Sequence, residues 1–131
     1  MSHVEKLDDE PIIIITAEGD VTPDMIQANR SAAMEQIAGI DRGPVVVIID
    51  FRDAELDFAN TMAILREDRA DEREAFYEQA FTILVGSNQY LDVYRNAMQQ
   101  PQYGSKELPA FPDMETALKA ARVYLDRDGE N

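Results

Sequence analysis

The stretch P-V-V-V-I-I-D-F-R-D, residues 44–53, decides the fold class. Residues 45–49 are all β-branched and apolar, so a strand built from them is apolar on both of its alternating faces. Such a run is typical of a strand in the middle of a parallel sheet, covered on each side. Because open α/β sheets bind ligands beyond the carboxyl ends of their strands, Asp50, Arg52 and Asp53 are candidate binding residues.

The rest of the sequence alternates between strand patterns and helix patterns. Apolar runs predict further strands at residues 12–17, 80–85 and 107–111, and Pro109 restricts the last of these to a sheet edge. Helix patterns follow at residues 22–38, from residue 57, at residues 88–98 and at residues 113–125. This order predicts an α/β fold, with a four- to five-stranded, mostly parallel mixed sheet and about four helices packed mainly on one face.

The chain is short enough to form one domain. Its 131 residues are 45% hydrophobic and 29% charged, which is ordinary for a globular protein. We expect a single domain at residues 11–126, preceded by a loose polar segment at residues 1–10 and followed by a polar tail at residues 127–131. No membrane span or signal peptide is predicted, so cytoplasmic residence is the default expectation.

Charge and missing residue types exclude several function classes. Twenty-six acidic residues against 12 basic ones give a net charge of −14, which repels nucleic acids and anionic membranes. A basic protein partner suits that charge, although acidity also serves solubility alone. The chain has no cysteine and one histidine, His3, in the segment expected to be loose. Thiolate or histidine catalysis, metal ligation by these residues and a cofactor are therefore not expected.

Two local patterns give structural expectations without chemistry. Glu18-Gly19-Asp20 after the first strand reads as a turn. The run R-E-D-R-A-D-E-R-E, residues 66–74, mixes opposite charges and predicts a solvated helix face. The helix that carries it either breaks near residue 70 or continues toward residue 77.

A second group of candidate residues follows the third predicted strand. Gly86, Ser87 and Asn88 lie between that strand and a helix, where free backbone N–H groups could bind an anion. No glycine-rich nucleotide motif is present, and we expect Ser87 to act as an ordinary helix cap. Tyr90 and Tyr94 lie close enough in sequence to line a neighbouring cleft.

Three patterns together resemble the STAS superfamily, the sulfate-transporter and anti-sigma-factor-antagonist domains, and in particular its SpoIIAA-like group. They are I-I-I-I-T-A-E-G-D-V-T-P-D at residues 12–24, V-V-V-I-I-D-F at residues 45–51 and F-P-D-M-E-T-A-L at residues 111–118. The resemblance covers residues 11–126. It implies four or five strands with helices mainly on one side, and a role as a regulatory interaction module.

The resemblance does not extend to the phosphorylation switch of the antagonists. In those proteins a partner kinase phosphorylates a serine at the start of the helix after a D-L pair, which matches Asp50-Phe51 here. The corresponding residues 57–61 are D-F-A-N-T and contain no serine. Thr61 is the nearest hydroxyl, about one turn too deep or on the wrong face of the helix. The usual serine switch is therefore not expected.

These observations lead to one preferred function and two alternatives. We expect a non-enzymatic, STAS-like regulatory or scaffolding domain that binds a protein partner, either a regulatory kinase or a basic protein. The expected binding residues are Asp50, Arg52, Asp53, Phe58, Asn60, Ser87, Asn88 and Tyr90. The alternatives are a small-ligand or lipid carrier with a cleft lined by Phe58, Met62, Tyr90 and Tyr94, and a Mg²⁺-dependent enzyme using Asp20, Asp50 and Asp53. An open sheet edge also leaves room for a homodimer.

Overall fold

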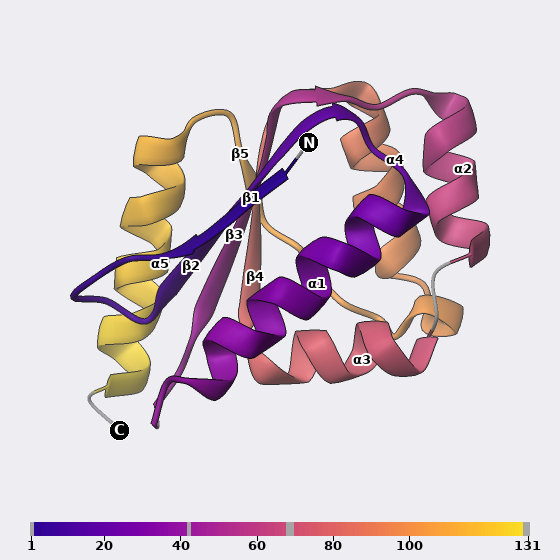
Figure 1. Ribbon diagram of the computed structural model, residues 1–131. Coiled ribbons are helices and arrows are strands. Elements are labelled where there is room, and N and C mark those ends of the chain that lie inside the picture. The colour runs from indigo at the N-terminus through magenta and orange to yellow at the C-terminus, as the bar shows by residue number, and fades with distance from the viewer. Residues whose placement is uncertain (1, 42, 68–69, 130–131) are drawn as a thin grey trace.

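The computed structural model describes residues 2–41, 43–67 and 70–129, which form one mixed sheet with helices on both faces (Figure 1). The five strands lie in chain order across the sheet: β1 (Ser2–Lys6), β2 (Ile12–Asp20), β3 (Val46–Glu55), β4 (Phe81–Val85) and β5 (Ala110–Phe111). The helices are α1 (Pro23–Ala38), α2 (Phe58–Glu67), α3 (Ala70–Gln79), α4 (Gln89–Met98) and α5 (Met114–Gly129), with a 3₁₀ turn at Pro101–Tyr103. β1 is antiparallel to β2, and the other neighbouring strands are parallel.

The central strand β3 is covered on both faces, as its sequence predicts. Val47 and Phe51 join the larger core beneath α1–α4, whereas Val46 and Ile48 pack toward α5. Figure 1 shows α5 alone on one side of the sheet and the other four helices opposite. The predicted α/β fold with helices mainly on one face is therefore confirmed.

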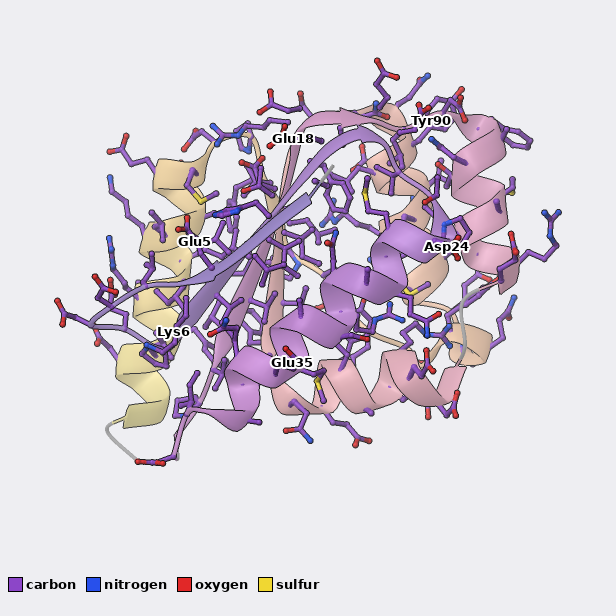
Figure 2. All side chains as sticks on the ribbon, viewed as in Figure 1. Glu5, Lys6, Glu18, Asp24, Glu35 and Tyr90 are labelled. Carbon is purple, nitrogen blue, oxygen red and sulfur yellow. The ribbon has the colours of Figure 1, made fainter. Side chains whose placement is uncertain are left out.

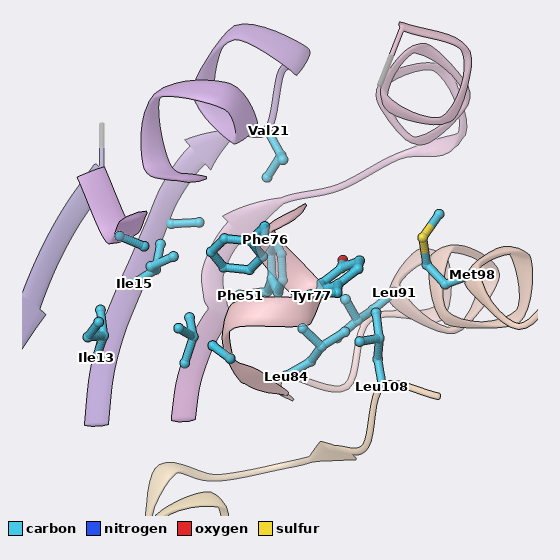
Figure 3. Close-up of a cluster of buried hydrophobic side chains, with 14 of the residues drawn as sticks. Ile13, Ile15, Val21, Phe51, Phe76, Tyr77, Leu84, Leu91, Met98 and Leu108 are labelled. Carbon is cyan, nitrogen blue, oxygen red and sulfur yellow. The ribbon is translucent and has the colours of Figure 1, made fainter. Parts of the chain in front are cut away.

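The larger core lies between the sheet and helices α1–α4 (Figure 3). Phe76 and Tyr77 from α3 meet there edge to face, with their ring centroids 5.6 Å apart. On the other face, α5 approaches the sheet closely because it presents the small, fully buried residues Ala117 and Ala121. The ring of Tyr124 stacks on Phe81 of β4, with centroids 4.2 Å apart, and extends this contact.

Several helix starts follow from local side-chain chemistry. The Thr22 hydroxyl accepts a hydrogen bond from the Met25 N–H at 3.1 Å, and Pro23 occupies the first helical position of α1. The Asp113 carboxylate accepts from the Thr116 N–H at 2.7 Å and caps α5. These caps satisfy N–H groups that have no partner within the helix.

The ends of the chain are more ordered than the sequence predicts. Residues 2–6 are expected to be loose, but they form β1. One inward-facing apolar residue, Val4, is enough for this strand, because the other face of an antiparallel edge strand can remain in contact with water. The expected turn at residues 18–20 is a continuation of β2, in which Gly19 has φ +74°. The expected polar tail is helical through Gly129 as part of α5, and residues 130–131 lie outside the described residues.

The charged run is also only partly solvated. α2 ends at Glu67 and α3 begins at Ala70, and Figure 1 shows these two helices running in different directions, so of the two alternatives the structure has the break. Residues 68–69 lie outside the described part of the chain. Arg73 is 2% exposed, and its guanidinium carbon lies 5.4 Å from the centroid of the Tyr103 ring. The expectation of a wholly solvated face is wrong at Arg73 because the chain after α4 folds back over it.

Gly86 gives a direct test of the strand-to-helix turn after β4. It has φ +149°, and a Cβ at this position would lie 3.3 Å from Leu91 Cδ2. We expect Gly86→Ala to lower the free energy of unfolding by about 1–3 kcal/mol, because it adds both backbone strain and crowding. Urea denaturation measures this loss.

Gly39→Ala is the matched control. Gly39 has φ −81°, and a Cβ there would meet only the Gln36 carbonyl oxygen at 3.5 Å. This variant should be as stable as the parent or more stable. Equal losses in the two variants would show that the turn at Gly86 does not require glycine.

Candidate functional site

The carboxyl end of β3 contains an irregularity that organises the candidate site. Thr16 of β2 pairs with Asp50, and Glu18 pairs with Asp53, so three steps along β3 span two steps along β2. This is a β-bulge, which locally redirects side chains and is common beside functional sites. The bulge lies between the two carboxylates that the sequence singles out.

Asp50 is buried and is held by Arg52. It follows Val46 and Ile48 on the face of β3 that α5 covers, and it is 5% exposed. Arg52 Nε donates to Oδ1 at 3.0 Å and Nη2 donates to Oδ2 at 2.8 Å, while the Arg52 backbone N–H also donates to Oδ1 at 3.0 Å. Both carboxylate oxygens are therefore engaged within the chain.

This pair sets the ionisation of both groups. Burial raises the pKa of Asp50, but the side-chain and backbone hydrogen bonds from Arg52 outweigh it, and the net pKa lies below the ordinary value of 3.8. The hydrogen bond to Asp50 raises the pKa of Arg52, and Asp53 and Asp113 raise it further through their charges. Asp50 therefore stays ionised, and its carboxylate binds the neighbouring Arg52.

The start of α2 is closed by a reciprocal cap. The Asp57 N–H donates to Asn60 Oδ1 at 2.7 Å, and the Asn60 N–H donates to Asp57 Oδ1 at 2.8 Å. Asn60 Nδ2 also donates to the Glu55 carbonyl at 3.0 Å. The arrangement is a capping box in which asparagine takes the place usually held by glutamate or glutamine. It orders the loop between β3 and α2.

Phe58 and Thr61 have opposite environments on this helix. Phe58, the first residue of α2, is 62% exposed. Thr61 is 1% exposed, and its hydroxyl donates to the Asp57 carbonyl at 2.6 Å. The only hydroxyl in this turn is therefore inaccessible, and the large apolar side chain faces outward.

The start of α4 is tied to the same loop. Asn88 caps α4 by accepting from the Tyr90 N–H at 2.7 Å, and its Nδ2 donates to the Leu56 carbonyl at 3.2 Å. The prediction that Ser87 caps α4 is therefore wrong. Asn88 caps the helix instead, because its longer amide side chain reaches both the helix and the loop before α2. Ser87 is exposed and Tyr90 is half-buried. Figure 2 shows Tyr90 at the end of α4 that lies beside α2.

The predicted site residues thus fall into two groups. Asp50 and Arg52 form a closed ion pair near the start of α5. Phe58 and Asn60 on α2, with Asn88 at the start of α4, belong to what we call the rim, defined as residues 53–60 and 87–90. The exposed carboxylates of Asp53, Glu55 and Asp57 also lie in the rim. Glu55 and Asp57 were not singled out from the sequence, although the D-x-x-N spacing at residues 57–60 was a usable capping signal.

A small hollow lies between the sheet and helices α1–α4, with a volume of about 40 Å³. Its walls are mostly apolar, with the hydroxyl oxygens of Tyr77 and Tyr94 3.0 Å apart at one side. A cavity that holds benzene has about 150 Å³, so this hollow suits water and is too small for a lipid. Of the residues expected to line a carrier cleft, Tyr94 lines it, while Phe58, Met62 and Tyr90 do not.

The geometry does not favour a carboxylate-dependent enzyme. Within residues 2–41, 43–67 and 70–129, no group of three or more histidine, cysteine, aspartate or glutamate residues could hold a metal ion. Asp50, the central carboxylate of that hypothesis, has both oxygens bound by Arg52.

Among the described helices, none combines the length and apolarity needed to cross a bilayer.

Comparison with solved structures places this architecture among SpoIIAA-like folds. An uncharacterized protein of the DUF3478 family from Shewanella loihica, described as having a SpoIIAA-like fold, matches with a TM-score of 0.57 and 16% identity over 91% of this chain and 90% of its own. The anti-sigma factor antagonist SpoIIAA in its unphosphorylated form matches with a TM-score of 0.54 and 20% identity over 93% of this chain and 98% of its own.

The chain therefore has a SpoIIAA-like α/β fold, as the resemblance in its sequence implies. No family model and no curated protein sequence matches it. At these levels of identity the likeness concerns the fold, and the function has to be argued from the site.

Replacing Asp50 tests the closed ion pair. Because the folded-state pKa of Asp50 lies below 3.8, its contribution to stability is complete above that pH and is lost as the pH falls through the lower folded value. We expect Asp50→Asn to lower the free energy of unfolding by about 1–3 kcal/mol at neutral pH, and to lose less stability than the parent on acidification. Urea denaturation at neutral and acidic pH measures both effects.

Asp53→Asn is the control for this experiment, because it removes the same charge from an exposed neighbour. It should change stability by less than about 0.5 kcal/mol. If the two variants behave alike, the Asp50–Arg52 pair does not stabilise the fold.

Proposed function

We propose that this protein is a non-enzymatic regulatory or scaffolding domain that binds a protein partner through the rim. The observation that carries the proposal is Phe58, a large apolar side chain that is 62% exposed on the first residue of a firmly capped helix. Buried aromatic anchors of this kind dominate the binding energy of many protein interfaces. A rigid support reduces the entropy lost on binding.

The charge of the rim indicates the chemistry of the partner. Asp53, Glu55 and Asp57 are exposed beside Phe58, and the chain as a whole carries −14. Complementary potentials accelerate encounter and select partners. A fitting partner, whether a regulatory kinase or another protein, has an apolar pocket for Phe58 surrounded by basic residues.

The proposal includes the absence of enzymatic activity, because the polar side chains near the rim are already hydrogen-bonded within the chain. Asp50 forms an ion pair with Arg52. Asn60 caps α2, and Asn88 caps α4. The hydrogen bonds of Asn60 and Asn88 hold the loops of the rim in place. The fold shared with the anti-sigma factor antagonist SpoIIAA supports a regulatory role.

Recognition is proposed to operate without the serine phosphorylation switch. The stretch at residues 57–61 has no serine, and the Thr61 hydroxyl is buried and donates to the Asp57 carbonyl. A kinase requires an accessible hydroxyl in an extended or frayed segment, whereas here the whole first turn would have to open.

Phe58→Ala tests the rim directly. We expect capture of the partner from an extract of the source cell to fall by about tenfold or more at equal bait concentration, because the anchor is lost. Quantitative mass spectrometry of the captured proteins gives the ratio to the parent chain.

Val123→Ala is the matched control. Val123 is 52% exposed on α5, which covers the opposite face of the sheet from α2. Its capture profile should equal that of the parent. Undiminished capture by Phe58→Ala would place the interface elsewhere and overturn the proposal.

The burial of Thr61 gives a second prediction. After expression in the source cell, phosphopeptide mass spectrometry of the purified chain should find Thr61 unmodified, because the hydroxyl is 1% exposed. A synthetic peptide of residues 53–65, in which the threonine is accessible, distinguishes burial from a missing kinase recognition sequence. Phosphorylation of Thr61 in the folded chain would contradict the proposal that the domain binds its partner without a phosphorylation switch.

A further inference from the structure

β1 is an edge strand with one unpaired side among the described strands. β2 lies on its inner side, and no other strand lies beyond it. The Leu7 N–H donates to the Ile12 carbonyl at 2.9 Å, just past the end of β1. Because backbone groups alternate in direction along an antiparallel strand, those of Ser2, Val4 and Lys6 point away from β2. These groups form a ready template for another strand.

The neighbourhood of this edge is compatible with a close approach. α1 covers the face of β1 on which Val4 packs. Gln27 and Arg30 of α1 face α2 and α3, so the opposite flank of the helix, with Met25, Ala32 and Gln36, lies on the side of β1. That flank carries no charge.

The other face of β1 carries two exposed polar side chains. His3 and Glu5 pair with Thr16 and Ile14 of β2, on the α5 side of the sheet, and their side chains are 64% and 56% exposed. Figure 2 shows Glu5 and Lys6 on β1 at the border of the sheet, away from the helices α2–α4. The side of the edge toward α5 therefore carries His3 and Glu5, while on the α1 side, where Val4 packs, the charged residue of the strand is Lys6.

We propose that β1 pairs with β1 of a second copy of this chain, antiparallel about a two-fold axis at Val4. In this register Ser2, Val4 and Lys6 exchange backbone hydrogen bonds with Lys6, Val4 and Ser2 of the other copy. The two sheets then become one continuous sheet across the axis.

Charge and overlap select this register. Centring the pair on Val4 uses the whole five-residue strand and places His3 of each copy opposite Glu5 of the other. Centring it on Glu5 or Lys6 brings identical charges together and shortens the overlap. The second copy is thus the occupant that complements this edge best.

The net charge of −14 on each copy opposes this association. Pairing of a five-residue strand also buries less area than a standard stable interface. The dimer is therefore weak, and it tightens as salt screens the repulsion between the copies. The rim is separate from this edge, since α2 lies on the far side of α1 from β1 (Figure 1). The proposed dimer and the proposed partner binding therefore use different surfaces, and failure of one proposal would not refute the other.

Sedimentation equilibrium of the full chain at low and high salt, with the variant Val4→Pro, tests the proposal. The parent should show a monomer–dimer equilibrium that strengthens with salt. The Val4 N–H points outward, so proline removes a hydrogen bond of the dimer without removing one between β1 and β2. We expect its dissociation constant to rise about tenfold or more while the circular dichroism spectrum keeps the signature of the parent fold, with some loss in melting temperature because Val4 also packs against the larger core. A parent that stays monomeric at every concentration and salt, or a dimer insensitive to Val4→Pro, would overturn the proposal.

Charge variants of His3 test the register and do not depend on proline. His3→Glu should weaken the dimer because it faces Glu5 of the other copy, and His3→Lys should tighten it. The double variant His3→Glu/Glu5→Lys should recover the affinity, since a carboxylate and an ammonium group then face each other. Gln102→Glu, an exposed position outside β1, controls for net charge. If His3→Glu acts no more strongly than Gln102→Glu and the double variant recovers nothing, the pairing through His3 and Glu5 is refuted.

Discussion

The structure depends on burying β3 on both of its faces. Val46, Val47 and Ile48 have no exposed surface, and each such side chain contributes on the order of 1.5–3 kcal/mol when it leaves water. One layer of helices cannot achieve this, because the side chains of a strand alternate between faces. The chain therefore needs α5 on one side as well as α1–α4 on the other. α5 is held there by its small buried alanines and by the ion pair of Arg122 with Glu10 at 2.9 Å.

This double cover gives the carboxyl end of β3 two different environments. Asp50 emerges on the α5 side, where Arg52 neutralises it, while Phe51 emerges on the other side and packs in the larger core. The bulge that follows separates this closed end from the exposed residues of the rim. Among the polar residues that follow this buried strand, some are held by contacts within the chain and others stay exposed, and only the tertiary contacts distinguish the two groups.

The rim combines strong local order with an exposed apolar group. Its loop is held by the Asp57–Asn60 cap and by the bond from Asn88 to the Leu56 carbonyl. Phe58 stays 62% exposed on this ordered loop, and it is the side chain that the proposed interface would bury. β1 offers a different kind of contact, in which backbone groups rather than a side-chain anchor would make the association.

The sequence by itself determined the features that depend on near neighbours along the chain. The apolar run at residues 45–49 marks the central strand, the alternation of strand and helix patterns gives the parallel sheet, and Thr22 with Pro23 marks the start of α1. Periodicity and capping act over a few residues, and can therefore be read from one segment at a time.

Tertiary structure alone decided the features that depend on contacts between distant segments. The polar residues 2–6 become a strand because β2 offers an edge, Arg73 is buried because the chain around Tyr103 covers it, and α5 takes the face that α1–α4 leave open. Asn88 rather than Ser87 caps α4, since its amide also reaches Leu56. The energies that settle these outcomes belong to pairs of segments, and no single stretch of sequence contains both members of a pair.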